Sequence, residues 1–489
     1  MTRRWLGSRA LRACLWAGAC LHASAHLEAD TGGPVDLDPE VLARVQEQKV
    51  AGVALAKEIW SYAELGYQEV RSSDLLRKYL SRNGFRVQTE VARIPTAFVA
   101  SAGSGEPVIG ILAEFDALPG LSQEAVPERK PMLEGAPGHA CGHHLFGAAS
   151  ATAGVAVARW LKASGRRGTV RVYGTPAEEG GSGKVYLARA GVFDDVDAVL
   201  HWHPGSRNDA SPSSSTANKS GRFTFHGIAA HAASAPHRGR SALDGVEAMN
   251  YMANLLREHV PSDSRIHYII THGGDAPNIV PETAEVYYYV RHPDLVTVQE
   301  LFERVVDTAR AAALGTGTQM EFEVMHGNYP LLPNEVLANR VHANLQALGG
   351  IRYDAKEERF AQHIRGTLTG RLPDMGTAGR IQPFQVHQNM GSTDVGDVSW
   401  IVPTAGFYTA TWVPGTSAHS WQAVAAGGMS IGHKGMHVAS KLLAVTAADL
   451  FRDPKLLVAA QQELLRRQGA DFHYAALLGD RDPPLDYRR

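Results

Sequence analysis

The chain has 489 residues, of which 44% are hydrophobic, and its 48 Lys and Arg nearly balance its 50 Asp and Glu. This length allows two domains with substantial cores. The near-neutral charge argues against binding to nucleic acid or to an anionic membrane surface, which needs an excess of positive charge. Histidine is the unusual count, with 22 residues.

The first 25 residues are typical of an export signal. A basic start, MTRRWLGSRALR, precedes the apolar and small ACLWAGACLHASA, and residues 23–25 fit an A-x-A cleavage site. The apolar run is too short to span a bilayer, and a buried N-terminal helix is the alternative. We therefore expect a periplasmic or secreted enzyme with no membrane segment, whose mature form begins near His26.

Cleavage of that signal changes the cysteine chemistry. Cys14 and Cys20 would leave with it, so Cys141 would be the only thiol of the mature protein. It could form no internal disulfide, even in an oxidising compartment. An unpaired thiol in that setting is either buried and inert or a metal ligand.

Strands alternate with helices up to about residue 217. The sequence predicts helix over 40–83, strands at 85–101 and 107–120, a small-residue helix at 144–165, and strands at 168–176 and 197–205. This alternation indicates an α/β domain with a mixed, mostly parallel sheet and helices on both faces. Ligands of such sheets gather at the carboxyl ends of the strands, where AEFDALPG, TPAEEGG and HWHPG all stand.

The composition changes at the Ser- and Asn-rich stretch 205–221, which is typical of a domain linker. From 222 the order strand, helix, strand, strand, helix, strand predicts an inserted ferredoxin-like α+β unit. The chain then returns to α/β character and has a long amphipathic helix over 432–451. We expect a signal peptide at 1–25, a catalytic domain at 26–217 and 332–489, and an inserted domain at 218–331.

Two short motifs carry metal-ligand chemistry. Cys141 and His143, in GHACGHHLFG, stand two residues apart, so a short turn can aim a thiolate and an imidazole at one zinc ion. Taken alone, that spacing is more often structural. Glu178 and Glu179, in TPAEEGG, are adjacent like charges that repel unless a cation joins them. A metal hydrolase would use Glu179 as ligand and Glu178 as general base, whereas a solvated acidic turn is the alternative.

Further histidines complete a possible ligand set. His201 and His203 lie on the same face of a predicted strand, and only one of them need bind. His419 lies in a loop just before the chain returns to helix. Together with Cys141, His143 and Glu179, these residues would supply five ligands, enough for two metals that share a bridging ligand.

Seven motifs in this order resemble the dimetal amidohydrolase and peptidase family of aminoacylases, hippurate hydrolases and auxin-conjugate hydrolases. They are AEFDALPG, GHACGHHLFGAASA, GTPAEEGGSGK, WHPG, GIAAHAASAP, APNIVPETAEVYYYVR and GSTDVGDVSWIVPTAGF, and the pattern runs from about residue 50 to 450. The resemblance implies two divalent metals in each protomer, zinc or manganese. It implies as their ligands the bridging thiolate of Cys141 together with His143, Glu179, His203 and His419. The H-x-x-P pattern of simpler relatives leaves His201 as the alternative to His203.

The resemblance also implies roles in the reaction. Glu178 would take a proton from the attacking water and return it to the leaving nitrogen. His231, in the inserted dimerisation or lid domain, would reach the active site of a partner protomer and stabilise the oxyanion. Asn278 and Arg291 would bind the substrate carbonyl or carboxylate, their alternatives being a turn Asn and a surface Arg. Asp116 would orient a ligand.

The implied activity is hydrolysis of N-acyl or N-aroyl amino acids, such as p-aminobenzoyl-glutamate, by a homodimer. A dipeptidase or carboxypeptidase of the same family is the alternative, and a non-catalytic metal- or peptide-binding protein is the more distant one. A heteromeric assembly stays open. Asp394 could be a helix N-cap, and His144, where relatives often have Asn or Asp, has no assigned role.

Overall fold

The computed structural model describes residues 36–488. The expected signal peptide at 1–25, with Cys14 and Cys20, lies outside the described residues. None of the helices within 36–488 combines the length and the hydropathy that crossing a membrane requires.

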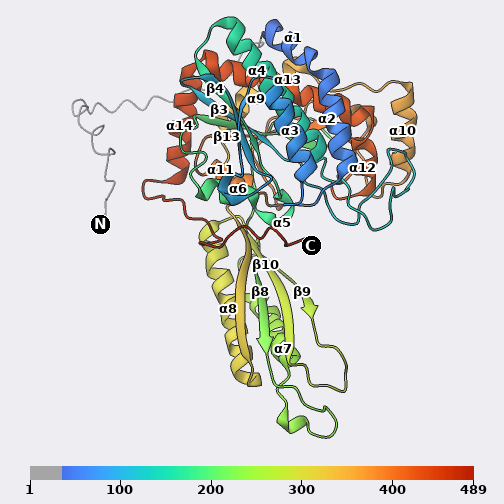
Figure 1. The fold of residues 1–489 in the computed structure, drawn as a ribbon, viewed down its shortest axis with the longest axis vertical. Coiled ribbons are helices and arrows are strands. Elements are labelled where there is room, and N and C mark those ends of the chain that lie inside the picture. The colour runs from blue at the N-terminus through green and yellow to red at the C-terminus, as the bar shows by residue number, and fades with distance from the viewer. Residues whose placement is uncertain (1–35, 489) are drawn as a thin grey trace, which may run out of the picture. The chain divides into compact units, whose positions relative to one another are not determined.

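A six-stranded sheet forms the centre of the larger domain, in the order β1-β2-β4-β3-β5-β13. Its strands are β1 (Arg86–Thr89), β2 (Phe98–Ser104), β3 (Val108–Ala113), β4 (Gly168–Gly174), β5 (Ala198–Leu200) and β13 (Thr404–Ala405). The pairs β4-β3, β3-β5 and β5-β13 are parallel, and the pairs that involve β1 and β2 are antiparallel. All six residues of β3 are buried, as expected when both faces of a sheet are covered. The predicted mixed, mostly parallel α/β fold is confirmed (Figure 1).

Helices make up most of the rest of the larger domain (Figure 1). They are α1 (Pro39–Glu47), α2 (Lys49–Tyr62), α3 (Val70–Arg82), α4 (His143–Ser164), α5 (Glu178–Gly181), α6 (Gly183–Arg189), α9 (Glu335–Leu348), α10 (Ala355–Gly366), α11 (Val395–Ser399), α12 (Trp421–Gly427), α13 (Ser430–Arg452) and α14 (Pro454–Gln468). Two short parallel pairs complete the domain. They are β6 (His203–Gly205) with β14 (Tyr408–Ala410), and β7 (Ser213–Ser214) with β12 (His387–Gln388).

Small residues let α4 approach the sheet closely. A Cβ added at Gly154 would lie 2.4 Å from Cγ2 of Val172 in β4, so this position accepts no side chain without a shift of helix or strand. The close approach brings the first turn of α4, which begins at His143, to the ends of the neighbouring strands.

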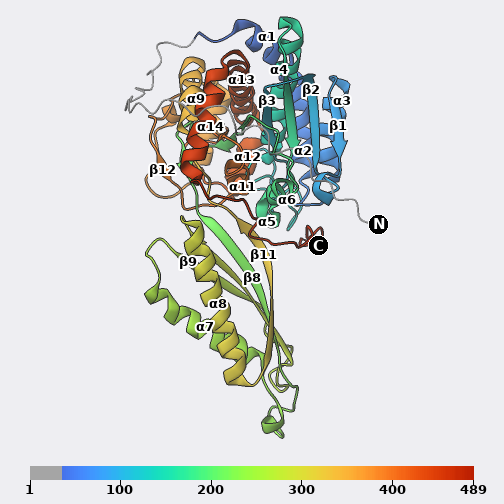
Figure 2. The same cartoon turned by 90° about the vertical axis from the view of Figure 1, so that its left-hand side faces the viewer.

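The inserted domain is an antiparallel sheet with two helices. Its elements are β8 (Ala217–His226), α7 (Ala242–Leu256), β9 (Arg265–His272), β10 (Thr283–His292), α8 (Leu295–Thr316) and β11 (Gln319–Asn328), and the sheet order is β11-β8-β10-β9. This β-α-β-β-α-β order is ferredoxin-like. Both helices cover one face of the sheet (Figure 2), around a core that includes Phe223, Tyr288 and Phe302.

Strand β8 carries the chain away from the larger domain (Figure 1). At about 3.3 Å per residue, its ten residues span about 30 Å. The loop 227–240 therefore lies at the far end of the inserted domain.

The stretch 205–221 is packed into the structure, so its interpretation as a linker was wrong. It contains β7 and the start of β8. Asn208 is fully buried; its Nδ2 donates to the carbonyl of Ala378 (2.8 Å), and its Oδ1 accepts from the amide of Ala410 (2.9 Å). The Asn208 side chain therefore serves as a hydrogen-bonding group inside the domain.

We expect Gly154→Val to lower the free energy of unfolding by about 1–3 kcal/mol, because the new side chain must displace Val172 or move α4 away from β4. Denaturant unfolding followed by circular dichroism measures this change. Ala163→Val, at an exposed position of the same helix, is the matched control and should cost at most about 0.7 kcal/mol through helix propensity. An equal loss in both variants would contradict the close packing of α4.

Candidate metal centre

Ligand-type side chains meet at the carboxyl ends of the central strands. Cys141 precedes α4, His143 is its first residue, Glu179 lies in α5 after β4, His203 begins β6, and His419 stands in the loop before α12. Gly142 joins the first two with a φ of 77°, and a Cβ there would lie 2.7 Å from Pro204. Only glycine fits this turn, which aims Cys141 and His143 toward the same point.

The thiol of Cys141 belongs to two groups of ligand atoms. One atom each from Cys141, His143 and His203 lie within 4.8 Å of one another, and so do atoms from Cys141, Glu179 and His419. The Sγ of Cys141 is 3.4 Å from Nε2 of His203, and Oε1 of Glu179 is 3.2 Å from Nε2 of His419. A thiol common to both groups is the arrangement that a bridging ligand requires. The structure brings all five expected ligands together.

Asp116 orients two of these ligands. Its Oδ1 lies 2.8 Å from Nδ1 of His143, and its Oδ2 accepts from the backbone amide of Glu179 at 2.9 Å. The contact at Nδ1 leaves Nε2 of His143 as the nitrogen available to a metal. Burial by itself would lower the pKa of His143, but Asp116, Cys141 and Glu114 raise it well above its ordinary value.

The residues present fit a divalent cation. The buried ligand atoms face one another rather than partners elsewhere: Nε2 of His143 lies 3.1 Å from Oε2 of Glu114, and Oε1 of Glu179 lies 3.2 Å from Nε2 of His419. Within residues 36–488, Nε2 of His143, Oε2 of Glu114 and Oε1 of Glu179 make no contact with the geometry of a hydrogen bond. Burial raises the pKa of the Cys141 thiol well above its usual range, and the Glu179 carboxylate adds to this. Because a thiol ligates as the thiolate, a cation would offset the desolvation that otherwise keeps it protonated.

Glu178 lies beside the expected ligand His143. Its carboxylate, with Glu114 and His143, forms a third group of atoms within 4.8 Å. Burial raises the pKa of Glu178 well above its usual range, and Glu114 and Glu179 add to the shift. A carboxyl group that readily holds a proton suits a residue that accepts a proton and later donates it.

Lys184 supplies positive charge beneath the cluster. Its Nζ lies 2.7 Å from Oε1 of Glu114 and 2.7 Å from Oδ1 of Asp394, and its amide donates to Oδ2 of Asp394 at 2.9 Å. Asp394 stands at the N-cap position of α11 but makes no capping bond, so its carboxylate acts in this ion pair instead. Glu114 and Lys184 were not predicted from the sequence. Lys184 pairs with Glu114, 70 residues before it, and with Asp394, 210 residues after it.

The other histidines of these motifs lie outside the ligand groups. His201 lines a pocket next to Gly406, and burial lowers the pKa of its ring to about 3. Nε2 of His139 contacts the carbonyl of Ile59 at 3.0 Å, and Nε2 of His144 contacts that of Gly427 at 3.1 Å. His139 and His144 therefore hold neighbouring segments together.

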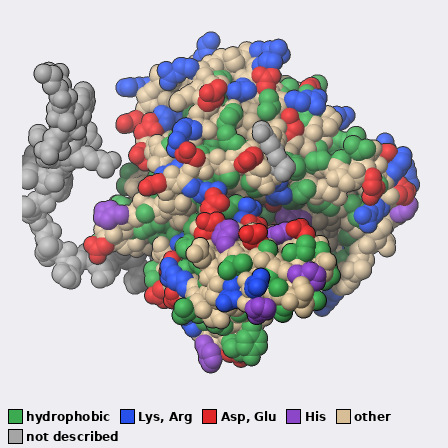
Figure 3. Space-filling view, turned by 60° about the horizontal axis from the view of Figure 1, so that its bottom comes forward, with side chains coloured by type: hydrophobic (Ala, Val, Ile, Leu, Met, Phe, Trp, Pro, Cys, Tyr) green, Lys and Arg blue, Asp and Glu red, His purple; other side chains and the backbone are tan. Residues whose placement is uncertain are grey.

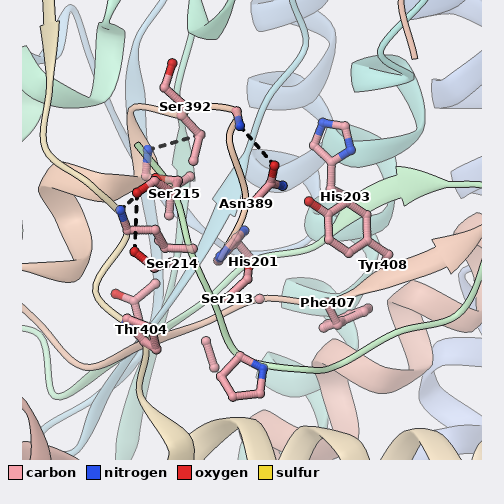
Figure 4. Close-up of a pocket in the computed structure, with 18 of the residues that line it drawn as sticks. His201, His203, Ser213, Ser214, Ser215, Asn389, Ser392, Thr404, Phe407 and Tyr408 are labelled. Atoms are coloured by element: carbon pink, nitrogen blue, oxygen red, sulfur yellow. Dashed lines mark hydrogen bonds between the residues drawn. The ribbon is translucent and has the colours of Figure 1, made fainter. Parts of the chain in front are cut away.

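A pocket opens beside the ligand cluster, and its wall is rich in hydroxyl and amide groups. Among its lining residues are Ser213, Ser214, Ser215, Asn389, Ser392 and Thr404 (Figure 4), together with Ser211 and Thr393. Leu331, Leu332 and Phe407 add apolar surface. On the molecular surface, acidic and histidine side chains gather in a hollow (Figure 3). Four of these serines, Ser211, Ser213, Ser214 and Ser215, come from the stretch interpreted as a linker. Nothing in the composition of that stretch distinguished a pocket wall from a linker.

The three expected residues of the inserted domain are placed differently from one another. Nη1 of Arg291 donates to Oγ of Ser392 in the pocket wall at 3.4 Å. His231 and Asn278 are exposed in two loops at the far end of the domain, where the amide of Ala232 donates to the Asn278 carbonyl at 3.0 Å. The span of β8 separates both from the ligand cluster of their own chain.

Comparisons with known proteins agree with the motifs. Residues 215–317 match the model of the peptidase dimerisation domain. The chain is 41% identical over 436 residues to one of the subunits of p-aminobenzoyl-glutamate hydrolase from Escherichia coli K12, covering 84% of this chain and 91% of that protein. It is 31% identical over 436 residues to the Xaa-Arg dipeptidase of Mus musculus, covering 86% of this chain and 90% of that protein.

Solved structures share the fold at low sequence identity. An aminobenzoyl-glutamate utilization protein from Klebsiella pneumoniae matches with a TM-score of 0.57 and 18% identity, covering 83% of this chain and 97% of that one. A dinuclear metal binding peptidase of the M20 family from Bacillus subtilis matches with the same TM-score and identity, covering 83% and 99%. The family resemblance predicted from the motifs is confirmed, because relatives above 30% identity match over nearly their whole length. The chain belongs to the M20 family of metal-dependent hydrolases that act on amide bonds.

Proposed function

We propose that the chain hydrolyses the amide bond of N-acyl or N-aroyl amino acids such as p-aminobenzoyl-glutamate. The observation that carries this proposal is the Cys141 thiol, shared by two ligand groups beside Glu178 and an open pocket. The 41% identity to the Escherichia coli p-aminobenzoyl-glutamate hydrolase chain supports the substrate class.

The proposed cofactor is a pair of divalent metals in each protomer. Cys141, His143 and His203 would hold one ion, and Cys141, Glu179 and His419 the other. A thiolate and three imidazoles favour zinc, and manganese is the alternative. When bound, such ions polarise an amide carbonyl and lower the pKa of water.

Glu178 is the proposed proton carrier. Its carboxylate would take a proton from the attacking water and deliver it to the amide nitrogen, so that the C–N bond breaks and a neutral amine leaves. Support comes from its position in the pocket wall and from burial, which raises its pKa. Asp116 would keep His143 and Glu179 oriented meanwhile.

We expect Glu178→Gln to lower kcat for p-aminobenzoyl-glutamate about 10²–10⁴-fold, the usual share of a general base, with an unchanged metal content. A hydrolysis assay paired with elemental analysis measures both. Glu134→Gln, at an exposed position, is the matched control and should keep wild-type activity. A metal-loaded Glu178→Gln protein with full activity would disprove the proton-transfer role.

A dipeptidase is the second candidate, because the Xaa-Arg dipeptidase is also a close relative. The charged residues that line the pocket, Glu114, Glu178 and Glu179, all belong to the cluster. Arg291 supplies a cation behind Ser392, and a cation recognises a carboxylate rather than a guanidinium. This charge pattern favours p-aminobenzoyl-glutamate over a dipeptide that ends in arginine.

We expect a higher kcat/KM for N-aroyl amino acids than for Xaa-Arg dipeptides in a substrate panel. Arg291→Gln should raise the KM for p-aminobenzoyl-glutamate about 10–100-fold, since hydrogen bonds to charged groups contribute about 1.5–3 kcal/mol. Arg310→Gln on α8, whose contact with Asp307 is at the surface, should leave KM unchanged. A preference for Xaa-Arg dipeptides would favour the dipeptidase instead.

We also propose a homodimer formed by the inserted domains. Support comes from the match to the peptidase dimerisation domain and from exposed apolar side chains on α7 and β9. These side chains are Tyr251 (67% exposed), Leu255 (53%), Ile269 (63%) and Ile270 (45%). In such a dimer His231 and Asn278 of one protomer would serve the site of the other, since the span of β8 keeps them from their own.

Mixed dimers test this sharing. Glu178→Gln and His231→Ala proteins should each be nearly inactive alone. The two proteins are then unfolded, combined in equal amounts and refolded. The mixture should show about one quarter of the wild-type rate, because half of the dimers are mixed and each mixed dimer has one intact site of two. Activity assays on the refolded mixture measure the gain. No gain, with dimers present by light scattering, would contradict a shared site.

The proposed location is the periplasm or the cell exterior. Support comes only from the basic, apolar and small-residue pattern of residues 1–25.

A further inference from the structure

The turn that carries Glu178 and Glu179 has a strained backbone. Ala177 and Ser182 adopt φ angles of 56° and 57°, and Gly180 adopts 90°. The left-handed region is unfavourable for a non-glycine residue, and such conformations persist only where their surroundings hold them. The direction of the Glu179 carboxylate therefore depends on the contacts that hold this turn.

Residues 67–69 hold the two ends of the turn. The carboxylate of Glu69 accepts from the amide of Ala177 at 2.8 Å, and the hydroxyl of Tyr67 donates to the carbonyl of Gly181 at 2.6 Å. Neither contact reaches the carbonyl of Glu179, which lies in the middle of the turn.

The C-terminal tail binds that carbonyl. The hydroxyl of Tyr487 donates to the Glu179 oxygen at 3.0 Å, and Nη2 of Arg488 donates to the same oxygen at 2.5 Å. The ring of Tyr487 meets the ring of Tyr67 edge-on, with centroids 5.6 Å apart. A Cβ on residue 66 would lie 2.3 Å from the Tyr487 hydroxyl. Glycine at this position therefore leaves the space that the Tyr487 side chain occupies.

The tail is itself fixed before it reaches the turn. Leu478 is buried, and Nη1 of Arg481 donates to the carbonyl of Val324 in β11 at 2.7 Å. Nε2 of Gln68 donates to the carbonyl of Leu485 at 2.7 Å. The tail therefore approaches the turn along a defined path, held by both domains.

We propose that residues 477–488 form a strap that positions Glu179 for metal binding, with Tyr487 and Arg488 as positioning residues. Two donors on one carbonyl fix the peptide plane of Glu179 and, with it, the direction of its side chain. The inference rests on the proposed role of Glu179 as a ligand. It predicts that the ion held by Cys141, Glu179 and His419 depends on the strap, whereas the ion held by Cys141, His143 and His203 depends on it much less.

Zinc titration of the full chain against a chelating dye tests the strap. In the Tyr487→Phe, Arg488→Gln double variant we expect one of two zinc sites to weaken about 10–100-fold, as is usual when a support of a ligand is removed. The kcat for p-aminobenzoyl-glutamate should fall while KM changes little. When Arg488→Lys replaces Arg488→Gln in the double variant, part of the zinc affinity should return, because an ammonium also donates to a carbonyl. Arg466→Gln, exposed on α14, is the matched control.

Wild-type affinity at both sites of the double variant would overturn the strap. Weakening of both sites in step with a fall in melting temperature would overturn it too, since that result indicates a general packing role. A wild-type chain that binds no zinc or manganese would instead refute the proposed function, so the two failures are distinguishable.

Discussion

Burial of several carboxylates around one ammonium group is the constraint on which the site depends. Lys184 is shared by Glu114 and Asp394, while Glu179 pairs with His419 rather than with a lysine or arginine side chain. An ionised carboxylate in a protein interior costs several kcal/mol unless a counter-charge and hydrogen bonds offset that cost. The buried thiol of Cys141 would add another negative charge as a thiolate. The cluster therefore needs further positive charge to offset the cost of burying these groups. Divalent cations at the shared thiol would provide it.

These groups lie close together because several strands end, and several helices begin, at the same edge of the central sheet. Strand β3 ends one residue before Glu114, and α4 begins at His143. The close packing of α4 on β4 at Gly154 sets the distance between the helix start and the strand ends. After β4 the chain makes the left-handed turn that exposes Glu178 to the pocket. The inserted domain lies beyond the pocket wall, and its Arg291 donates to Ser392 of that wall.

Much of this arrangement was predictable from local sequence. The α/β fold and the family follow from motifs at strand ends, and Cys141, His143 and Glu179 do meet. Strand periodicity alone could not choose between His201 and His203, because residues two apart on a strand point to the same side; the family resemblance favoured His203, and the structure places His203 in a ligand group. In the structure β5 ends before His201 and β6 begins at His203, and this break separates the two side chains. Contacts of Lys184 with Asp394, and of the tail with the Glu179 turn, join distant segments and leave no periodic pattern in the sequence.

The central claim is that one thiol serves two metal positions. The most direct measurement is a zinc titration of Cys141→Ala beside His203→Ala and His419→Ala, with each protein shown to be folded. The account predicts two zinc equivalents for the wild type, loss of affinity at one position in each histidine variant, and loss at both positions in Cys141→Ala. A Cys141→Ala protein that keeps either position at wild-type affinity would contradict it.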